Sequence, residues 1–470
     1  MTKTRRPRPA APRSVRAAAA ALAVTGLLTT AACSGSPKTA EPAGGAAVTA
    51  EPAALSPSAS PSASPSGGVV ALTPDVMGKL DAAIQQVMSQ ASVPGVIVGY
   101  TTPDGSYQKA FGLADPGRKV PMSTDLYTRI GSVTKTLTAT AVLRLVDQGK
   151  VGLDDPISKY VPNVPNGDKI TVRELGDMRS GLYNYSLDPD FDHALLSDPT
   201  RPFTPDQLLA YSYKHPADFA PDAKFEYSNT NAILLGLLVE KVSGQPLQDF
   251  LKAQVFDPAG MKNSVFPTDA TFPDPHAHGT TNQTLDGAVA DATDWNPSWG
   301  WAAGAAISTL ADLQTWSKVL ATGTPLIKPD TQAERLKTRE AGLPALGYGF
   351  GVFNTHGWIG HNGSLPGYQT VVIYLPAAQA SLVIMTNTDV SYQGTEPSTL
   401  LARAITQIVS PNNVYTLPTP AETGSPTAPG SPSGSPSPSP SAGASQTPLG
   451  TTTPAPSGSA TLHISEETDS

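Results

Sequence analysis

Between residues 73 and 412 the apolar positions repeat with two different periods. They recur at helical spacing in "TPDVMGKLDAAIQQVMSQ", where Thr73 precedes Pro74, and in "NTNAILLGLLVEKVSG", which closes on Gly244. A threonine followed by a proline is a common helix start, and a glycine is a common helix end. The pattern therefore predicts an amphipathic helix in each of these two segments.

Apolar runs of strand length lie near both ends of the same region. "PGVIVGYTTPDGSYQKAFGLAD" predicts two strands around the turn "PDG". Later, "GYGFGVF", "GWIGHNGS", "YQTVVIYLP" and "ASLVIMTNT" predict four successive strands, and a last helix is predicted at about residues 397–409. Strands at both ends with helices between them indicate an α+β domain. We expect one antiparallel sheet of N- and C-terminal strands, flanked by helices, with an inserted, mainly helical region.

Two segments outside this pattern are rich in alanine, proline, serine and glycine. They cover residues 33–70 and 413–470 and include "SPSASPSASPSGG" and "SPSGSPSPSPSAG". Such composition buries too little apolar surface to fold, and proline keeps the chain extended. We expect a disordered linker and a disordered tail around one folded domain at residues 73–412.

The first 32 residues have the pattern of a secretory signal peptide. The basic stretch "KTRRPRPAAPRSVR" precedes a short, alanine-rich apolar run that ends at Cys33. "TAAC" followed by "SGS" resembles a bacterial lipobox, although Thr30 replaces the usual leucine. Cys33 is the only cysteine and is expected to carry a lipid. This predicts an extracytoplasmic protein held at the membrane by that lipid alone; simple secretion is the alternative.

The net charge argues against one class of partner. The chain has 31 basic and 39 acidic residues, a formal net charge of -8, and its one basic cluster lies in the predicted signal peptide. Nucleic-acid-binding proteins present basic patches on the folded domain. We therefore expect no nucleic-acid partner.

The candidate chemistry begins in "YTRIGSVTKTLTATAVLRLVDQGK", where Ser132 and Lys135 stand three residues apart. The apolar residues that follow at helical spacing predict that this face is buried. Burial disfavours the charged form of a lysine, so Lys135 could accept a proton from Ser132 and make it a nucleophile. In the alternative interpretation, Ser132 caps the helix and Lys135 extends to solvent.

Two further motifs follow in order along the chain. "FEYSNTNAILLG" contains Tyr227-Ser228-Asn229, and "GHNGSLPGY" contains His361-Asn362-Gly363. With Ser-x-x-Lys, Tyr-x-Asn and His-x-Gly in this order, the sequence resembles the penicillin-recognising serine hydrolases. It looks closest to serine D-alanyl-D-alanine carboxypeptidases and class C β-lactamases, in the subgroup with histidine in the third motif. "ITVRELGDMRSGLYNY" and "WGWAAGAAISTLADLQTW" also resemble blocks of this family, and the resemblance covers most of residues 73–412.

The resemblance implies a role for each motif residue. Ser132 would form the acyl-enzyme, and Lys135 and Tyr227 would share the general-base work; which of them is the resting base stays open. His361 would take the place of the family's usual lysine and supply positive charge only when protonated. An unperturbed histidine titrates at about 6.5, so this predicts pH-dependent substrate capture near neutrality.

Substrate binding is assigned in the same way. The backbone N–H groups of Ser132 and Ser364 would form the oxyanion hole, and Gly363 would let the substrate lie against the strand edge. Asn229 would hydrogen-bond Lys135 or a substrate amide. Either Trp299 or Trp301 would wall the pocket or pack as an ordinary aromatic residue.

The sequence departs from the family pattern where a substrate carboxylate would be held. Asn362 and Ser364 stand at the positions of the family's threonine-like donors. The subgroup's carboxypeptidases use an arginine of the preceding strand, but "YGFGVFNTHGWIGH" contains neither Arg nor Lys, and Phe353 is near the expected place. This puts strict carboxypeptidase specificity in doubt, although it leaves acyl transfer intact.

The expected function is an extracytoplasmic serine acyl hydrolase. A D-alanyl-D-alanine carboxypeptidase acting on peptidoglycan stem peptides, with β-lactams as inhibitors or substrates, fits the motifs best. The alternatives are an esterase or β-lactamase on the same site, or a non-catalytic lipid-anchored binding protein. The resemblance implies neither a metal nor an organic cofactor. His276 and His278 in "PHAHG" are expected to be loop residues and not a metal site.

Overall fold

The computed structural model describes residues 68–342 and 345–417. The predicted signal peptide, Cys33 and most of the predicted linker and tail lie outside these residues. The packed chain continues a few residues beyond the predicted domain end at 412. Tyr415 is fully buried, and the indole N–H of Trp358 donates a 2.6 Å hydrogen bond to the carbonyl of Asn413.

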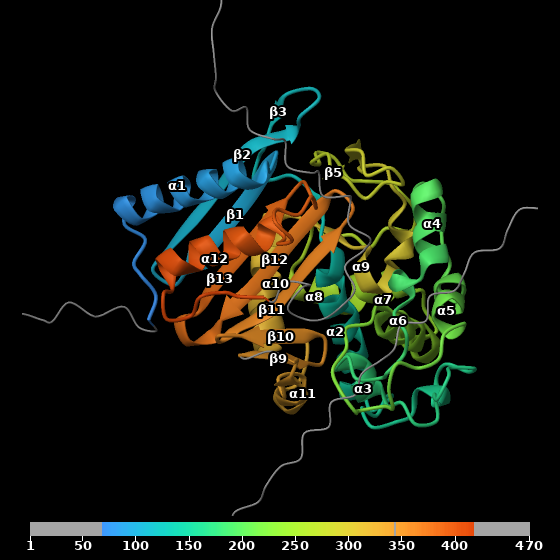
Figure 1. Ribbon diagram of the computed structural model, residues 1–470. Helices are drawn as coiled ribbons and strands as arrows, with labels where there is room; N and C mark the ends of the chain where they lie inside the picture. Colours follow the sequence, from blue (N-terminus) through green and yellow to red (C-terminus); the bar gives the residue numbers. More distant parts are fainter. Residues whose placement is uncertain (1–67, 343–344, 418–470) are drawn as a thin grey trace, which may run out of the picture. The chain divides into compact units, whose positions relative to one another are not determined.

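The predicted antiparallel sheet is confirmed. Nine strands run in the order β3-β2-β1-β13-β12-β11-β10-β9-β8, so the first long strand pairs with the last (Figure 1). Every pairing in this sheet is antiparallel. The strands are β1 Gly95–Thr102, β2 Gly105–Asp115, β3 Val120–Pro121, β8 Arg339–Glu340, β9 Leu346–Gly349, β10 Val352–Thr355, β11 Trp358–Leu365, β12 Tyr368–Leu375 and β13 Ala380–Thr386. Two small sheets pair β4 Thr128–Arg129 with β7 Ile307–Ser308, and β5 Thr280–Thr281 with β6 Ala290–Asp291.

One strand prediction was wrong in detail. "GYGFGVF" was expected to be a single strand, but it forms the end of β9, a tight turn and the start of β10. Gly351 in the turn has φ +71°, which favours glycine. A Cβ at this position would also lie 2.4 Å from Cβ of Ala139. The close approach of this turn to the central helix therefore splits the apolar run into a hairpin.

Helices cover both faces of the sheet. α1 Pro74–Ala91 and α12 Pro397–Val409 pack together on one face, and α10 Leu310–Thr322 packs on the other (Figure 1). α1 begins as predicted, because the Thr73 hydroxyl accepts a hydrogen bond from the N–H of Val76. In α12 the buried residues Leu401, Ile405 and Val409 recur every fourth position and form the stripe that faces the sheet.

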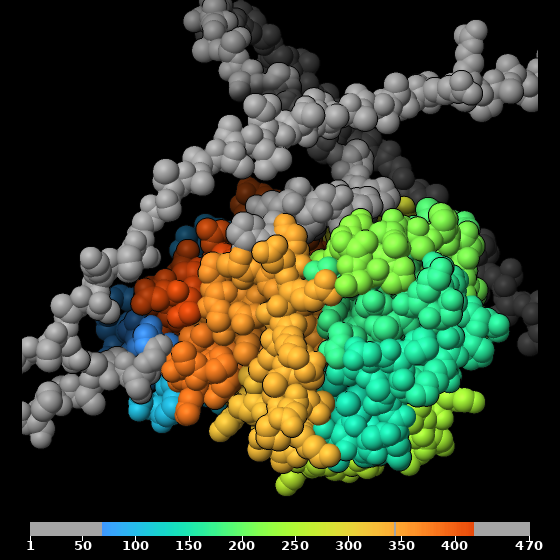
Figure 2. Space-filling model, turned by 90° about the horizontal axis from the view of Figure 1, so that it is seen from below, coloured from blue at the N-terminus to red at the C-terminus, as the bar shows by residue number. Residues whose placement is uncertain are grey.

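The predicted helical insertion lies beside the sheet. The remaining α-helices are α2 Thr134–Asp147, α3 Val172–Gly176, α4 Pro189–Ser197, α5 Pro205–Tyr213, α6 Asn229–Ser243, α7 Leu247–Leu251, α8 Asp257–Ala259, α9 Trp301–Gly304 and α11 Pro329–Arg335. The short 3-10 segments are η1 Gly131–Val133, η2 Ile157–Lys159, η3 Tyr185–Leu187, η5 Pro297–Trp299 and η6 Pro376–Ala378, and Lys252–Phe256 forms a π-helical turn labelled η4. Seen from below, residues around β9 and β10 abut the helical region (Figure 2).

α2 is the central helix between the two halves. Ten consecutive residues, Thr134 to Leu143, are buried, so the helix is enclosed on all sides. It packs against α6, α7 and α9 of the helical region and against β11 of the sheet.

Within the described residues, no helix combines the length and apolar character needed to cross a membrane.

Candidate active site

Ser132 and Lys135 contact each other at the start of the central helix. Ser132 lies in η1, the 3-10 turn that leads directly into α2, and Lys135 lies one turn later. Nζ of Lys135 is 2.9 Å from Oγ of Ser132 and donates a 2.8 Å hydrogen bond to the carbonyl of Ala303. Lys135 is only 3% exposed, and this burial lowers its pKa well below the usual value. The alternative in which Lys135 extends to solvent is therefore wrong.

Tyr227 lies on the other side of the lysine. It stands two residues before α6, and Nζ of Lys135 is 4.9 Å from the centre of its ring. Desolvation raises the pKa of Tyr227, while Ser132 lies near enough to lower it. The two hydroxyls are nevertheless not in hydrogen-bond geometry, and the described residues provide no partner for the phenolic oxygen. The fold thus gathers the predicted triad of Ser132, Lys135 and Tyr227 and leaves the tyrosine hydroxyl available.

The edge of β11 passes directly beside Ser132. β11 pairs with β12 along its length, but with β10 only at Trp358–Gly360. From His361 to Leu365 its other edge has no strand partner within the described residues and packs against η1. An unpaired edge of this kind can accept an extended substrate as an added strand.

Two glycines allow this edge to approach the serine. A Cβ on Gly363 would lie 2.1 Å from the carbonyl oxygen of Ile130 and 2.8 Å from the backbone nitrogen of Ser132. A Cβ on Gly131, whose φ is +53°, would lie 2.7 Å from the backbone nitrogen of Ser364. Because neither glycine has a side chain, β11 and η1 can approach each other closely here. This is where the backbone N–H groups of Ser132 and Ser364 lie, the two groups expected to form the oxyanion hole.

Gly363→Ala should lower kcat/KM by about 100-fold, because a displacement of about 1 Å at a reacting group has an effect of that size. The added methyl group must push β11 away from η1. Steady-state kinetics with a neutral ester measure the loss, and circular dichroism checks the fold. Gly78→Ala in α1, where a Cβ would meet nothing within 4 Å, is the matched control. Wild-type kinetics in Gly363→Ala would contradict the role given to this contact.

A small cavity of about 30 Å³ opens at the serine. It is lined by Ser132, Tyr185, Asn229, Trp299, Gly300, Ala303, Gly304, Ser364 and Leu365. The nucleophile thus shares its cavity with three of the predicted substrate-binding residues, Asn229, Trp299 and Ser364. Trp301 is not among the lining residues and instead packs closely against Gly236 of α6. Of the two tryptophans left open by the sequence, Trp299 walls the cavity.

Asn229 does not hydrogen-bond Lys135 and binds two residues at the start of η3. Its side-chain amide donates a 2.9 Å hydrogen bond to the hydroxyl of Ser186, and its backbone N–H donates to Asn184. The hydrogen bond to Lys135, one of the two expected alternatives, is absent, and Lys135 donates to the carbonyl of Ala303. Asn229 therefore lines the cavity but does not orient the lysine.

His361 does not supply the predicted positive charge. Its ring is 2% exposed and lies beside three aromatic rings, those of Tyr227, Tyr348 and Phe353. Burial, opposed by the carbonyl of Asn362 and reinforced by the charge of Lys135, lowers the pKa of His361 to about 3. The predicted charge switch near pH 6.5 is therefore wrong.

The hydrogen bonds of His361 fix its neutral form. Nδ1 lies against the carbonyl oxygen of Asn362, which can only accept, so Nδ1 carries the proton. Nε2 is then the acceptor, and it takes a 3.0 Å hydrogen bond from the hydroxyl of Tyr348. In the structure His361 is a buried, neutral group that is hydrogen-bonded to Tyr348 and to the carbonyl of Asn362.

His361 should make the fold sensitive to acid. Between about pH 6.5 and pH 3 the unfolded chain binds a proton at this residue that the folded chain does not, so the free energy of unfolding falls as the pH falls. From pH 7 to pH 5 the expected loss is about 2 kcal/mol. Urea unfolding at both values should show this loss in wild type and a smaller one in His361→Gln. Exposed His193→Gln is the control, and equal losses in all three proteins would contradict this assignment.

The sequence analysis missed one residue of the site, Glu396. It directly precedes α12, and its Oε2 accepts a 3.2 Å hydrogen bond from the side-chain amide of Asn362. Its charge also raises the pKa of Tyr227, in addition to the larger effect of desolvation. No motif marks Glu396, because only the packing of α12 on the sheet brings it to β11.

Phe353 occupies the place where a substrate-binding arginine was expected. It is buried, and its ring lies 5.6 Å from that of His361 and 6.2 Å from that of Tyr415. An apolar residue in this position offers no charge to a substrate.

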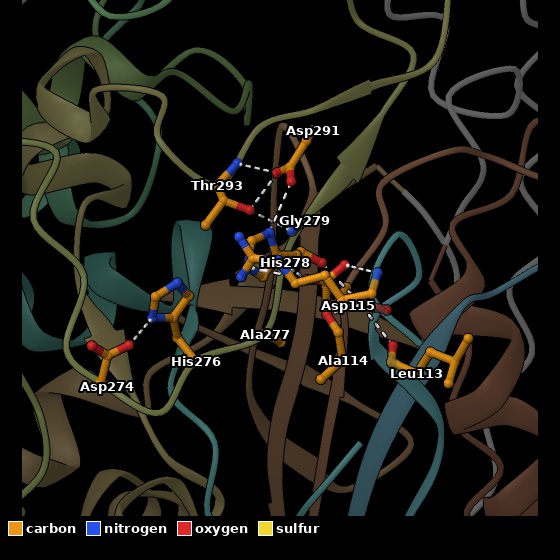
Figure 3. A network of polar contacts seen from close by, with 12 residues as sticks. Leu113, Ala114, Asp115, Asp274, His276, Ala277, His278, Gly279, Asp291 and Thr293 are labelled. Atoms are coloured by element: carbon orange, nitrogen blue, oxygen red, sulfur yellow. Dashed lines mark hydrogen bonds and ion pairs between the residues drawn. The ribbon is translucent and has the colours of Figure 1, made fainter. Parts of the chain in front are cut away.

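The two loop histidines lie in a separate polar network (Figure 3). Nδ1 of His278 is 2.8 Å from a carboxylate oxygen of Asp291, and Nδ1 of His276 is 3.0 Å from one of Asp274. The backbone N–H of His278 donates to the carbonyl of Ala114, which ties the loop to the end of β2. Within residues 68–342 and 345–417, no group of three or more His, Cys, Asp or Glu side chains is arranged to hold a metal ion.

Comparison with known proteins identifies the family and the fold. The family described as Beta-lactamase matches residues 80–406. Esterase EstB of Burkholderia gladioli is 33% identical over 201 residues, which are 40% of this chain and 51% of the esterase. The chain spans about half to two thirds of the length of the curated relatives it matches.

Two solved structures share the fold. The D-amino acid amidase from Ochrobactrum anthropi SV3, complexed with D-phenylalanine, superposes with a TM-score of 0.62 at 26% identity, covering 70% of this chain and 98% of the amidase. The octameric penicillin-binding protein homologue from Pyrococcus abyssi has a TM-score of 0.60 at 25% identity, covering 70% of this chain and 77% of that one.

Proposed function

The chain belongs to the β-lactamase family of serine hydrolases, and we propose that it hydrolyses amides or esters of D-amino acids or short D-peptides through an acyl-enzyme at Ser132. The observation that carries this proposal is the 2.9 Å contact between Lys135 Nζ and Ser132 Oγ in a buried site. A binding protein has no need for a buried lysine against a serine, so the non-catalytic alternative is weaker.

The opposite pKa shifts of the two candidate bases suggest their roles. Burial lowers the pKa of Lys135 and raises that of Tyr227. The lysine therefore gives up its proton more readily, and the tyrosine keeps its own. Such a separation is typical of an acid–base pair. It favours Lys135 as the resting base, which the sequence left open.

The reaction then follows in two steps. Ser132 Oγ attacks the substrate carbonyl while Lys135 accepts its proton, and the backbone N–H groups of Ser132 and Ser364 stabilise the oxyanion. When the tetrahedral intermediate collapses, the carbonyl carbon stays bonded to Ser132, and the departing amine or alcohol receives a proton from Tyr227, which Lys135 reprotonates. Water then attacks the acyl-enzyme. Tyr227 accepts a proton from this water as its own proton passes to Lys135, and Lys135 returns a proton to Ser132 when the acid is released.

Two observations bear on the class of substrate: the activities of the similar proteins, and the charges of the residues beside β11. The similar proteins are an esterase, a D-amino acid amidase and a penicillin-binding protein homologue. A D-alanyl-D-alanine carboxypeptidase of the His-x-Gly subgroup, with peptidoglycan stem peptides as substrates, is the second candidate. It is favoured by the three motifs in order, but Phe353 and Glu396 provide no positive charge for the free carboxylate of such a substrate.

A substrate panel tests the proposal. Purified protein is assayed with D-phenylalanine amide, p-nitrophenyl acetate, D-alanyl-D-alanine peptide and nitrocefin, and intact mass reports any acyl adduct. We expect turnover of the amide or the ester and an adduct that maps to Ser132. Turnover of the free D-alanyl-D-alanine peptide alone would favour the second candidate. No turnover and no adduct with any compound would contradict a hydrolase function.

We also propose that the protein acts outside the cytoplasm, held at the membrane by a lipid on Cys33. The support is the basic and apolar leader, the lipobox-like "TAAC" and the proline-rich linker that follows it. Expressed in its native cell envelope, the protein should partition into detergent, and Cys33→Ala should be released or left unprocessed. A mature N-terminus well beyond Cys33 would indicate simple secretion.

A further inference from the structure

Glu396 places a carboxylate beside β11, at the side chains of Asn362 and Ser364. Side chains alternate between the two faces of a strand, so Asn362 and Ser364 of β11 lie on one face and His361 on the opposite one. Both Asn362 and Ser364 are half-exposed. Asn362 donates to Oε2 of Glu396 at 3.2 Å, and Ser364, which lines the cavity with Ser132, lies near enough to lower the pKa of Glu396. The carboxylate is therefore coupled to both donors on this face.

The Glu396 carboxylate does not cap the helix that it precedes. Glu396 is the residue before the first turn of α12, where a side chain commonly caps the helix, but its side chain makes no capping hydrogen bond. The side chain turns instead toward β11 and remains partly exposed. Among the described residues, no Lys, Arg or His forms an ion pair with Glu396, in contrast to the paired surface carboxylates.

The same carboxylate occupies the position where an anion would otherwise be favoured. The N-terminus of a 13-residue helix attracts negative charge, and Asn362 and Ser364 could donate hydrogen bonds to a substrate carboxylate. With Glu396 already there, a substrate carboxylate would meet a like charge, whereas a protonated amine would meet an opposite one.

We propose that Glu396, with Asn362 and Ser364, forms a subsite that binds a protonated amine of the substrate and excludes a free carboxylate. This inference rests on the proposed function and narrows its substrates to amine-bearing amides and esters. Desolvation raises the pKa of Glu396, whereas its hydrogen bonds with Asn362 and Ser364 favour the ionised form.

Two matched pairs of compounds test the subsite at pH 7, below the usual α-amino pKa of about 7.7–8.0, so that the amine is protonated. D-phenylalanine amide is compared with its N-acetyl derivative, which lacks the positive charge, and benzylpenicillin is compared with its methyl ester, which lacks the negative charge. Wild type should prefer the free amine and the methyl ester, each by about tenfold or more in kcat/KM or in acylation rate, the factor expected for one hydrogen bond to a charged group. Glu396→Gln, which keeps an acceptor for Asn362, should reduce both preferences about tenfold.

Asp75→Asn removes an exposed carboxylate from α1 and is the control for net charge. Unchanged ratios in Glu396→Gln for both pairs would overturn the proposal. A change confined to the penicillin pair would overturn the amine subsite, because it would show exclusion of carboxylates alone. p-Nitrophenyl acetate carries no charge and separates the two levels of failure: if wild type neither turns over any compound nor forms an adduct at Ser132, the proposed function itself fails.

Discussion

Ser132→Ala should abolish acylation and lower kcat/KM by about 10⁴-fold or more, the scale seen when a catalytic nucleophile is removed. Alanine leaves the helix start intact, and only the oxygen 2.9 Å from Lys135 is lost. Intact mass after incubation with an activated ester should show an adduct in wild type and none in the variant.

Ser228→Ala is the matched control for this loss. Ser228 is also buried, stands next to Tyr227, and its hydroxyl has no hydrogen-bond partner within the described residues. We expect its removal to leave acylation within a few fold of wild type. An adduct that persists in Ser132→Ala would mean that another residue is the nucleophile.

Lys135 and Tyr227 should behave as one unit in proton transfer. Lys135→Met and Tyr227→Phe should each slow acylation by about 10²- to 10⁴-fold, the usual contribution of general acid–base catalysis. The double variant should be little slower than the more damaged single variant, because either loss interrupts the same transfer. Stopped-flow acylation rates with one activated ester measure all four proteins.

The two single variants also distinguish the bases. If Lys135 is the resting base, Lys135→Met should remove the rising limb of the pH–rate profile, whereas Tyr227→Phe should lower the rate at every pH and keep that limb. Near-normal acylation in Tyr227→Phe would show that another group protonates the leaving group. Losses that add in the double variant would contradict a shared transfer.

Local signals in the sequence were enough for most of the fold. The Thr73–Pro74 start of α1, the Gly244 end of α6 and the helix at residues 397–409 all follow from capping residues and apolar spacing, which depend on neighbours within one or two turns. "GYGFGVF" failed as a strand because Gly351 turns the chain with φ +71° and lies close to Ala139, more than 200 residues earlier. Apolar content alone does not distinguish a strand from a tight hairpin.

The sequence by itself also determined the order of the three motifs and the one-turn spacing that puts Lys135 beside Ser132, since a helix brings residues three apart onto one face. Only the tertiary structure decided that Lys135 donates to the carbonyl of Ala303 and not to Asn229, and that Glu396 reaches Asn362. Only it decided that His361 is neutral, because a pKa depends on burial and on charges brought near by packing. Spacing along a chain fixes contacts within a turn or a strand pair, whereas the partners of a buried polar group come from whichever elements the sheet and the central helix place around it.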